Sequence, residues 1–184
     1  AKSWALDKSV AKELQRLKER DNHTNHAYLL VNYAIFIATV AATLWSFHVA
    51  QSSGWGAWLT VPVTVLAVII VGGFQHQLGG AIHEGTHYIL FADRRKNELI
   101  SDWFAAFPIY TSTYQYRVHH LAHHQFVNDP ARDPDISQLK DSDHWLDFPV
   151  THIDVLRKLL KQLWLPNIFR FTLYRAKYSA LGHE

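Results

Sequence analysis

The sequence predicts an all-α integral membrane protein, in which one transmembrane helical hairpin is followed by cytoplasmic helices that carry clusters of histidine. Three observations lead to this prediction. Residues 22–83 contain no Asp, Glu, Lys or Arg. Two apolar runs of membrane-spanning length lie within that uncharged stretch. The 13 histidines are grouped rather than scattered, and imidazole is the commonest protein ligand for metals.

The composition limits the possible functions. The 184 residues are enough for one domain. The 18 Lys and Arg nearly balance the 16 Asp and Glu, so the net charge of +2 indicates no nucleic-acid partner. The lack of cysteine excludes disulfides, thiolate metal sites and iron–sulfur clusters in this sequence. We divide the domain into a cytoplasmic amphipathic arm (1–26), a transmembrane hairpin (27–82) and a cytoplasmic part that carries the histidines (83–184).

The hairpin is predicted from residues 28–50 and 58–74, and the second run can extend toward Ile82. A helix crosses a bilayer with about 20 apolar residues, so both runs suit spanning helices. Basic residues precede the first run and follow the second, whereas the turn at residues 51–57 has none. The positive-inside rule then predicts that both ends of the hairpin are cytoplasmic. A pair of buried helices in a soluble protein is the alternative, although such long uninterrupted runs are uncommon there.

Two further segments have amphipathic helical spacing. Apolar residues recur between residues 6 and 17, which predicts a helix in the arm that packs on the membrane surface or on a partner. A second apolar stripe between residues 155 and 164 precedes Pro166, which would end the helix. We expect this helix to lie on the cytoplasmic membrane surface, with packing inside the cytoplasmic part as the alternative.

The first histidine cluster directly follows the hairpin. His83 and His87 are four residues apart, so they share one face of a helix and can hold one metal ion. His76 lies seven residues before His83 on much the same face, where a packing role is the commoner one. The segment HEGTH also matches H-E-x-x-H, the signature of zinc metalloproteases, in which Glu84 would activate water. An intramembrane zinc protease is therefore one alternative function.

The second cluster has four histidines within six residues: His119, His120, His123 and His124. Each buried imidazole needs a polar partner, so packing alone explains this group poorly. A histidine-rich loop that binds adventitious metal is the alternative. Together the two clusters offer at least five imidazoles, whereas a monozinc protease needs three protein ligands. Such ligation suits iron well, although zinc, copper and nickel also accept imidazole.

Taken together, the clusters resemble the first two histidine boxes of the membrane fatty acid desaturase and hydroxylase superfamily. The resemblance rests on His83-x-x-x-His87 followed by His120-x-x-His123-His124. It extends to HEGTHYILFADRRKNELISDWF, to the Tyr-Arg-Val before the second box and to the Asp-Pro pairs after it, covering roughly residues 75–145. Acyl desaturases, carotenoid hydroxylases and ketolases, and alkane hydroxylases share this pattern, so it does not fix the substrate.

The resemblance implies a non-haem di-iron enzyme of lipid metabolism that uses O₂ to desaturate a fatty acyl chain, with carotenoid or alkyl hydroxylation as the alternative. Electrons would come from a separate ferredoxin or cytochrome b5-like protein, because the sequence contains no haem-attachment or flavin fingerprint. Two iron ions would be held by His83, His87, His120, His123 and His124. Residues expected to position these ligands or add to them are His76, Glu84, Arg117, His119, Asp129, Asp133 and Asp135.

Some of these implied roles have strong alternatives. The three aspartates lie in an Asp-Pro-rich stretch, for which an exposed turn is an equally good interpretation. Arg117 is expected to pair with one of them, and Glu84 to accept the N–H of a ligand imidazole.

The sequence departs from the family pattern in one way. Family members carry a third box, another H-x-x-H-H, after a second pair of spans. After His124 only His144, His152 and His183 remain, and they do not form that pattern. We therefore expect an incomplete chain that is inactive alone. A non-catalytic membrane protein that keeps its histidines as a scaffold is the third class of function.

Overall fold

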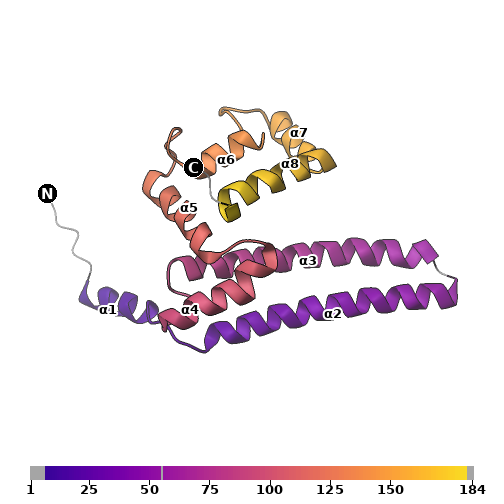
Figure 1. The fold of residues 1–184 in the computed structure, drawn as a ribbon, viewed down its shortest axis with the longest axis horizontal. Helices are drawn as coiled ribbons and strands as arrows, with labels where there is room; N and C mark the ends of the chain where they lie inside the picture. The colour runs from indigo at the N-terminus through magenta and orange to yellow at the C-terminus, as the bar shows by residue number, and fades with distance from the viewer. Residues whose placement is uncertain (1–6, 55, 182–184) are drawn as a thin grey trace.

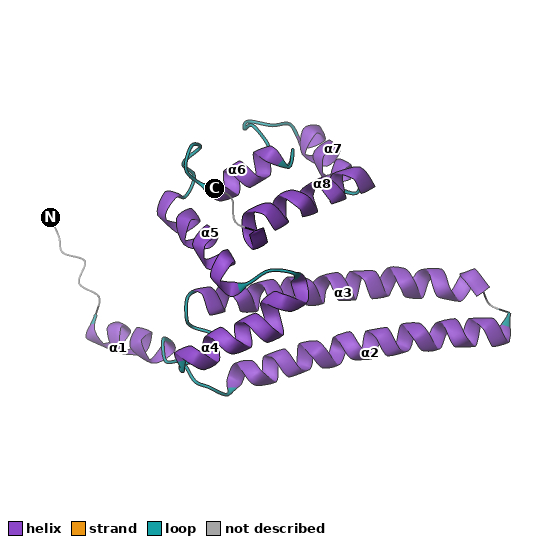
Figure 2. Cartoon of the chain, in the orientation of Figure 1, coloured by secondary structure: helices purple, strands orange, loops and turns teal. Residues whose placement is uncertain are grey.

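A computed structural model describes residues 7–54 and 56–181, and within these ranges all regular structure is helical (Figures 1 and 2). The all-α prediction is confirmed. The start of the amphipathic arm, residues 1–6, and residue 55 of the turn lie outside the described residues.

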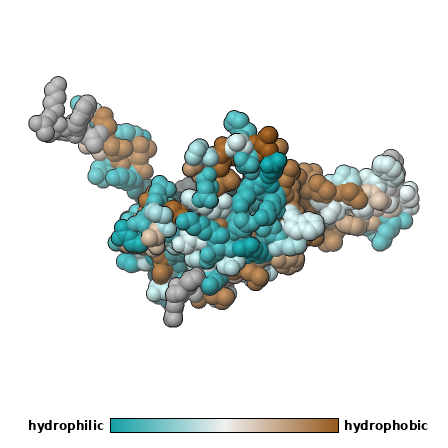
Figure 3. Space-filling model, turned by 90° about the horizontal axis from the view of Figure 1, so that it is seen from above, coloured by the Kyte–Doolittle hydropathy of each residue, from teal (hydrophilic) through white to brown (hydrophobic). Residues whose placement is uncertain are grey.

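The long hairpin consists of α2 (Thr24–Ser53) and α3 (Gly56–Thr86), which pack side by side (Figure 1). Gly54 ends α2 with a φ of 74°, a left-handed conformation that costs glycine little. Both helices are long and apolar enough to cross a membrane. Only 6% of the most apolar stretch of each helix is buried within the described residues, whereas the core helix of a soluble domain is mostly buried. Hydrophobic residues accordingly cover much of the hairpin surface in Figure 3.

The amphipathic helix expected near the N-terminus is present as α1 (Lys8–Leu17). The side chain of Asp7 caps it by accepting a hydrogen bond from the backbone N–H of Ser9, 2.7 Å away. No residue of α1 is buried, so its apolar stripe has no packing partner within the described part of the chain.

A short layer folds back against the end of the hairpin that carries the first histidine box. It consists of α4 (Arg94–Ser101), a π-helical turn η1 (Asp102–Ala106) and a 3₁₀ turn η2 (Phe107–Ile109). The main core forms where this layer meets α2 and α3, from Leu29, Phe74, Leu78, Ala81, Ile82, Leu90, Phe91, Ala105 and Ala106. This core fixes one face of the last turns of α3, so the opposite face is left for other roles.

Four further helices and a final π-helical turn lie above α3 in Figure 1. They are α5 (Thr113–Phe126), α6 (Pro134–Asp141), α7 (His152–Gln162), α8 (Leu165–Ala176) and η3 (Lys177–Leu181). The side chain of Ser112 caps α5, and that of Thr151 caps α7. The helix predicted between residues 155 and 164 is α7, which ends at Gln162. Pro166 lies beyond it, in the first turn of α8, where no backbone N–H is needed.

Candidate metal centre

Four imidazoles converge where the end of α3 meets α5. His83 lies in the last turn of α3, and the N–H of His87 still donates to the carbonyl oxygen of His83 at 3.3 Å, so the pair keeps helical spacing. Nε2 of His120 lies 2.9 Å from Nε2 of His87 and 3.0 Å from Nε2 of His124. The ring centre of His83 is 4.8 Å from that of His87 and 4.7 Å from that of His120. One donor nitrogen from each of the four lies within 4.8 Å of the others.

The protonation of this cluster suits a metal ion. Burial, followed by the proximity of His83 and His124, lowers the pKa of His120 to about 4. Burial is also the main reason that the pKa of His87 is lowered. At neutral pH both rings are therefore uncharged, and a neutral imidazole offers one lone pair to a metal. Convergent lone pairs of this kind fit a divalent transition-metal ion.

Two neighbouring side chains fix the orientation of these rings. Oε1 of Glu84 lies 2.9 Å from Nδ1 of His83, where it accepts the ring N–H and leaves the lone pair on Nε2. This is the role expected of Glu84. The ring of Tyr116 stacks on His120, with ring centres 5.3 Å apart and an angle of 13° between the planes.

His123 does not join the four-histidine cluster. Its Nδ1 lies 2.9 Å from Asp133 Oδ1 and 3.3 Å from Asp135 Oδ2. The other oxygen of Asp135 lies 2.7 Å from Nε2 of His119, so this carboxylate connects the two imidazoles. His123, Asp133 and Asp135 also form a group with donor atoms within 4.8 Å of one another. Because Nδ1 of His123 is hydrogen-bonded to Asp133, Nε2 is the ring nitrogen left to bind a metal ion.

The carboxylate of Asp133 is held firmly. Its side chain is 1% exposed. Burial would raise the pKa of Asp133, but hydrogen bonds from His123 and from the N–H groups of Asn128 and Asp135 outweigh burial and lower it. The hydrogen bond to Asp133 in turn raises the pKa of His123. Asp133 also caps α6, so the ring of His123 is oriented by a group that is itself fixed to a helix.

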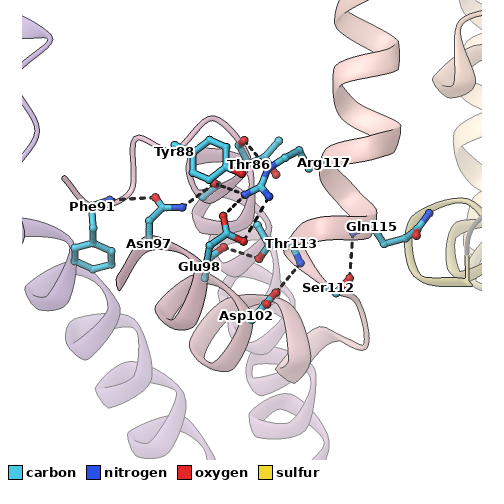
Figure 4. Close-up of polar contacts among 12 residues, drawn as sticks. Thr86, Tyr88, Phe91, Asn97, Glu98, Asp102, Ser112, Thr113, Gln115 and Arg117 are labelled. Carbon is cyan, nitrogen blue, oxygen red and sulfur yellow. Dashed lines mark hydrogen bonds and ion pairs between the residues drawn. The ribbon is translucent and has the colours of Figure 1, made fainter. Parts of the chain in front are cut away.

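A buried arginine holds the two boxes at a fixed separation (Figure 4). Arg117, on α5, donates from Nε to the carbonyl oxygen of Thr86 at 3.0 Å and from Nη2 to that of Gly85 at 3.1 Å. Nη2 also lies 2.6 Å from Oε1 of Glu98, on α4. The guanidinium stacks over the ring of Tyr88, 4.1 Å from its centre. The end of α3, the start of α5 and α4 are therefore joined through one side chain.

The same junction permits very close approach of the backbone at Gly85. A Cβ on Gly85 would lie 2.1 Å from Oγ of Ser101, closer than two atoms can pack. The Ser101 hydroxyl lies 2.8 Å from that of Thr113, at the start of α5. Asn97 donates to the carbonyl oxygen of Gly85 at 2.9 Å, and both Asn97 and Ser101 are fully buried. Glycine is needed at position 85 because α4 contacts α3 directly there.

The structure separates the expected site residues into three groups. The cluster brings together His83, His87, His120 and His124 beside Glu84, and the second group contains His119, His123, Asp133 and Asp135. The remaining three residues, His76, Arg117 and Asp129, belong to neither group of potential metal ligands in the described part of the chain.

One expectation is wrong, and for Asp129 the alternative interpretation, a turn, is the one observed. Arg117 pairs with Glu98 and not with an aspartate, because it lies at the start of α5 and the aspartates follow the far end of that helix. Asp129 pairs with Arg132 and accepts the N–H of Ala131, so it stabilises its own turn. Sequence reasoning missed Glu98, and no local pattern marked it, because its role depends on the docking of α4 against α5.

Comparison with known proteins identifies a family for this chain. Residues 58–182 match the family model described as Fatty acid desaturase, which is more than half of the chain. The chain therefore belongs to the fatty acid desaturase family, and membership implies the use of iron. The chain is similar to dihydrorhizobitoxine desaturase of Bradyrhizobium elkanii, with 29% identity over 132 residues. These residues are 71% of this chain and 34% of that protein, so the chain spans about a third of its relative's length. No solved structure matches the chain.

Proposed function

We propose that this chain is part of an oxygen-dependent, non-haem di-iron oxidoreductase that desaturates a fatty acyl chain. The observation that carries the proposal is the convergence of His83, His87, His120 and His124 at the end of a membrane-length hairpin. Hydroxylation of a carotenoid or alkyl substrate is the second candidate within the same family. The desaturase named above as a relative supports desaturation over hydroxylation.

In this proposal the four-histidine cluster would hold one iron ion, and His123 would help to hold a second. Bound iron supplies the activation of O₂ and the removal of hydrogen from an unactivated C–H bond. The residues of this chain hold and orient the ligands. Glu84 fixes the tautomer of His83, and Asp133 fixes the ring of His123. Asp135 adds support by contacting both His119 and His123.

The proposed centre needs donors in addition to these five histidines. We infer that they come from a third histidine box outside residues 1–184, as the family pattern implies, and that these residues alone do not turn over substrate. The electron donor would be a separate ferredoxin or cytochrome b5-like protein. The hairpin would place the N-terminus and both boxes on the cytoplasmic side, since the flanking segments are basic and residues 51–57 are not.

A zinc protease of the H-E-x-x-H type is poorly supported. Such an enzyme needs Glu84 free to activate a metal-bound water. Here Oε1 of Glu84 accepts the N–H of His83. The second box also brings His120 and His124 to the same point, which gives more imidazoles than a single catalytic zinc uses.

The test uses the full-length protein in membranes, with lipid oxidation and iron content as the two measurements. His87→Ala and His123→Ala should each abolish oxidation while membrane insertion is retained. His152→Ala is the matched control, because His152 is exposed and far from both groups in sequence. Normal turnover in either ligand variant would contradict the proposed ligand assignment. Glu84→Gln should keep bound iron, whereas loss of peptide cleavage in that variant would support a protease.

A further inference from the structure

A groove of about 650 Å³ runs along α3 to the histidine cluster. Its other walls come from η2, from the start of α5, and from α8 with η3, which lie above α3 (Figure 1). The side formed by α3 is a single helical face with the spacing i, i+3, i+4, i+7, i+8 and i+11: Gly72, Gln75, His76, Gly79, Gly80 and His83.

Packing among the described residues does not explain the glycines on this face. A Cβ at Gly72, Gly79 or Gly80 would meet no heavy atom within 4 Å. A glycine inside a helix is destabilising relative to alanine. The opposite face of the same turns carries the buried side chains of Phe74 and Leu78. What the three glycines provide is therefore free space beside the helix, leading toward His83.

One charged residue, Arg175, lines this groove, and no lining residue is a carboxylate. Arg175 lies at the C-terminal end of α8. It forms no ion pair and no side-chain hydrogen bond with any residue in the ranges 7–54 and 56–181. An unpaired guanidinium in a partly apolar groove is suited to bind a planar anion through two parallel hydrogen bonds.

Arg175 is at the histidine end of the groove. Arg175 and Tyr116 both line the groove, and η3, which directly follows the end of α8, packs against α5. The ring of Tyr116 stacks on His120. An anion on Arg175 would therefore lie beside the proposed metal centre, with the glycine face of α3 extending away from it.

We propose that this groove binds the substrate, and that the substrate is an amphiphile whose carboxylate or phosphate is held by Arg175 while its aliphatic part lies along Gly80, Gly79 and Gly72. The identity of the groove as a substrate site rests on the proposed function, but binding itself requires no metal. The geometry brings the C–H bonds nearest the acidic group, rather than the distant end of the chain, to the histidine cluster.

The first test measures binding to the metal-free full-length protein in nanodiscs of neutral phosphatidylcholine. Dodecanoate and dodecyl phosphate should bind at least tenfold more tightly than dodecanol in isothermal titration calorimetry. Arg175→Gln should abolish this preference. Lys177→Gln is the matched control, since it removes the same charge from an exposed neighbour that does not line the groove. Equal binding of acid and alcohol, or an unchanged preference in Arg175→Gln, would overturn the proposal.

Two further measurements separate the alternatives. Displacement of dodecanoate by phosphatidylglycerol in the disc would assign Arg175 to bilayer headgroups and overturn its role in substrate binding. Gly79→Leu should block dodecanoate binding, whereas Gly73→Leu should not, because both positions have open space but only Gly79 lines the groove. His87→Ala should still bind dodecanoate. Binding without oxidation by the iron-loaded wild-type protein would contradict the proposed function and leave the groove assignment standing.

Discussion

The guanidinium of Arg117 and the carboxylate of Glu98 lie 2.6 Å apart and join the helix of the second histidine box to α4. The same guanidinium donates to two carbonyl oxygens at the end of α3, which carries the first box. Only 11% of the Arg117 side chain is exposed, compared with 35% of the Glu98 side chain. Buried donors and acceptors are costly to leave unpaired, so this one side chain controls the separation of the boxes.

Arg117→Met should therefore reduce both stability and metal binding. Without the guanidinium, Glu98 and the carbonyl oxygens of Gly85 and Thr86 have no partner, which should lower the free energy of unfolding by about 3 kcal/mol. The histidine boxes would also lose their fixed separation, so metal affinity should fall by about 10- to 100-fold. Denaturant unfolding in detergent and a cobalt titration measure the two effects. The control is Arg132→Gln, because Arg132 is 64% exposed and its pair with Asp129 should contribute less than about 1 kcal/mol.

Removing the hydroxyl of Thr86 should not destabilise the protein. Thr86 is 1% exposed, and its Oγ1 has no hydrogen-bond partner among the described residues. Thr86→Val should be neutral or stabilise the protein by about 1 kcal/mol, because it removes an unsatisfied buried polar atom. Thr113→Val should destabilise by about 1 kcal/mol, since the Thr113 hydroxyl contacts that of Ser101. Equal destabilisation of the two variants in thermal unfolding would contradict this explanation.

Within the metal cluster, His120 should be the most sensitive position. Its Nε2 is the atom that lies within 3.0 Å of both His87 and His124. His120→Ala should therefore abolish the absorption of bound cobalt(II) in a titration of the 184-residue chain. A cobalt spectrum in His120→Ala that matches the wild-type spectrum would exclude the four-histidine cluster as the metal site. His48→Ala, which changes a histidine near the end of α2 beside the turn of the hairpin, serves as the control.

Low pH should destabilise α7, because Lys158 and Lys161 of this helix pair with Asp143. Hydrogen bonds from Lys161 and Lys158 lower the pKa of Asp143 to about 2, from an ordinary value of 3.8. Since the folded-state pKa is the lower one, this stabilisation is fully present above about pH 4 and is lost as the pH falls through about 2. Hydrogen exchange of the α7 amides, corrected for intrinsic rate, should accelerate over that interval. Asp143→Asn should remove this pH dependence, and the effect should weaken at high salt.

The topology of the hairpin can be tested with single cysteines, because the sequence contains none. A cysteine at Ser53 should react with an impermeant thiol reagent only from the outside, and one at Lys158 only from the cytoplasm. Reaction at Ser53 only from the cytoplasmic face would contradict the predicted orientation.

Much of the fold followed from local patterns in the sequence. An uncharged apolar stretch has to form hydrogen bonds within itself when it crosses a bilayer, and a helix does this without a partner. The two long helices, the all-α class and the family resemblance could therefore be predicted, and they are confirmed. The pairing of His83 with His87 was also predictable, because one helical turn brings residues four apart to the same side.

Tertiary structure decided which side chains meet between elements. His123 and His124 are adjacent in sequence, but successive residues point about 100° apart on a helix. Because α5 contacts both α6 and the end of α3, His123 meets Asp133 at the start of α6, while His120 and His124 meet the histidines at the end of α3. Likewise Glu98 is 19 residues from Arg117, and only the docking of α4 brings them together. Sequence periodicity determines the face of a helix on which a residue lies, whereas the contact that it makes depends on how separate helices pack.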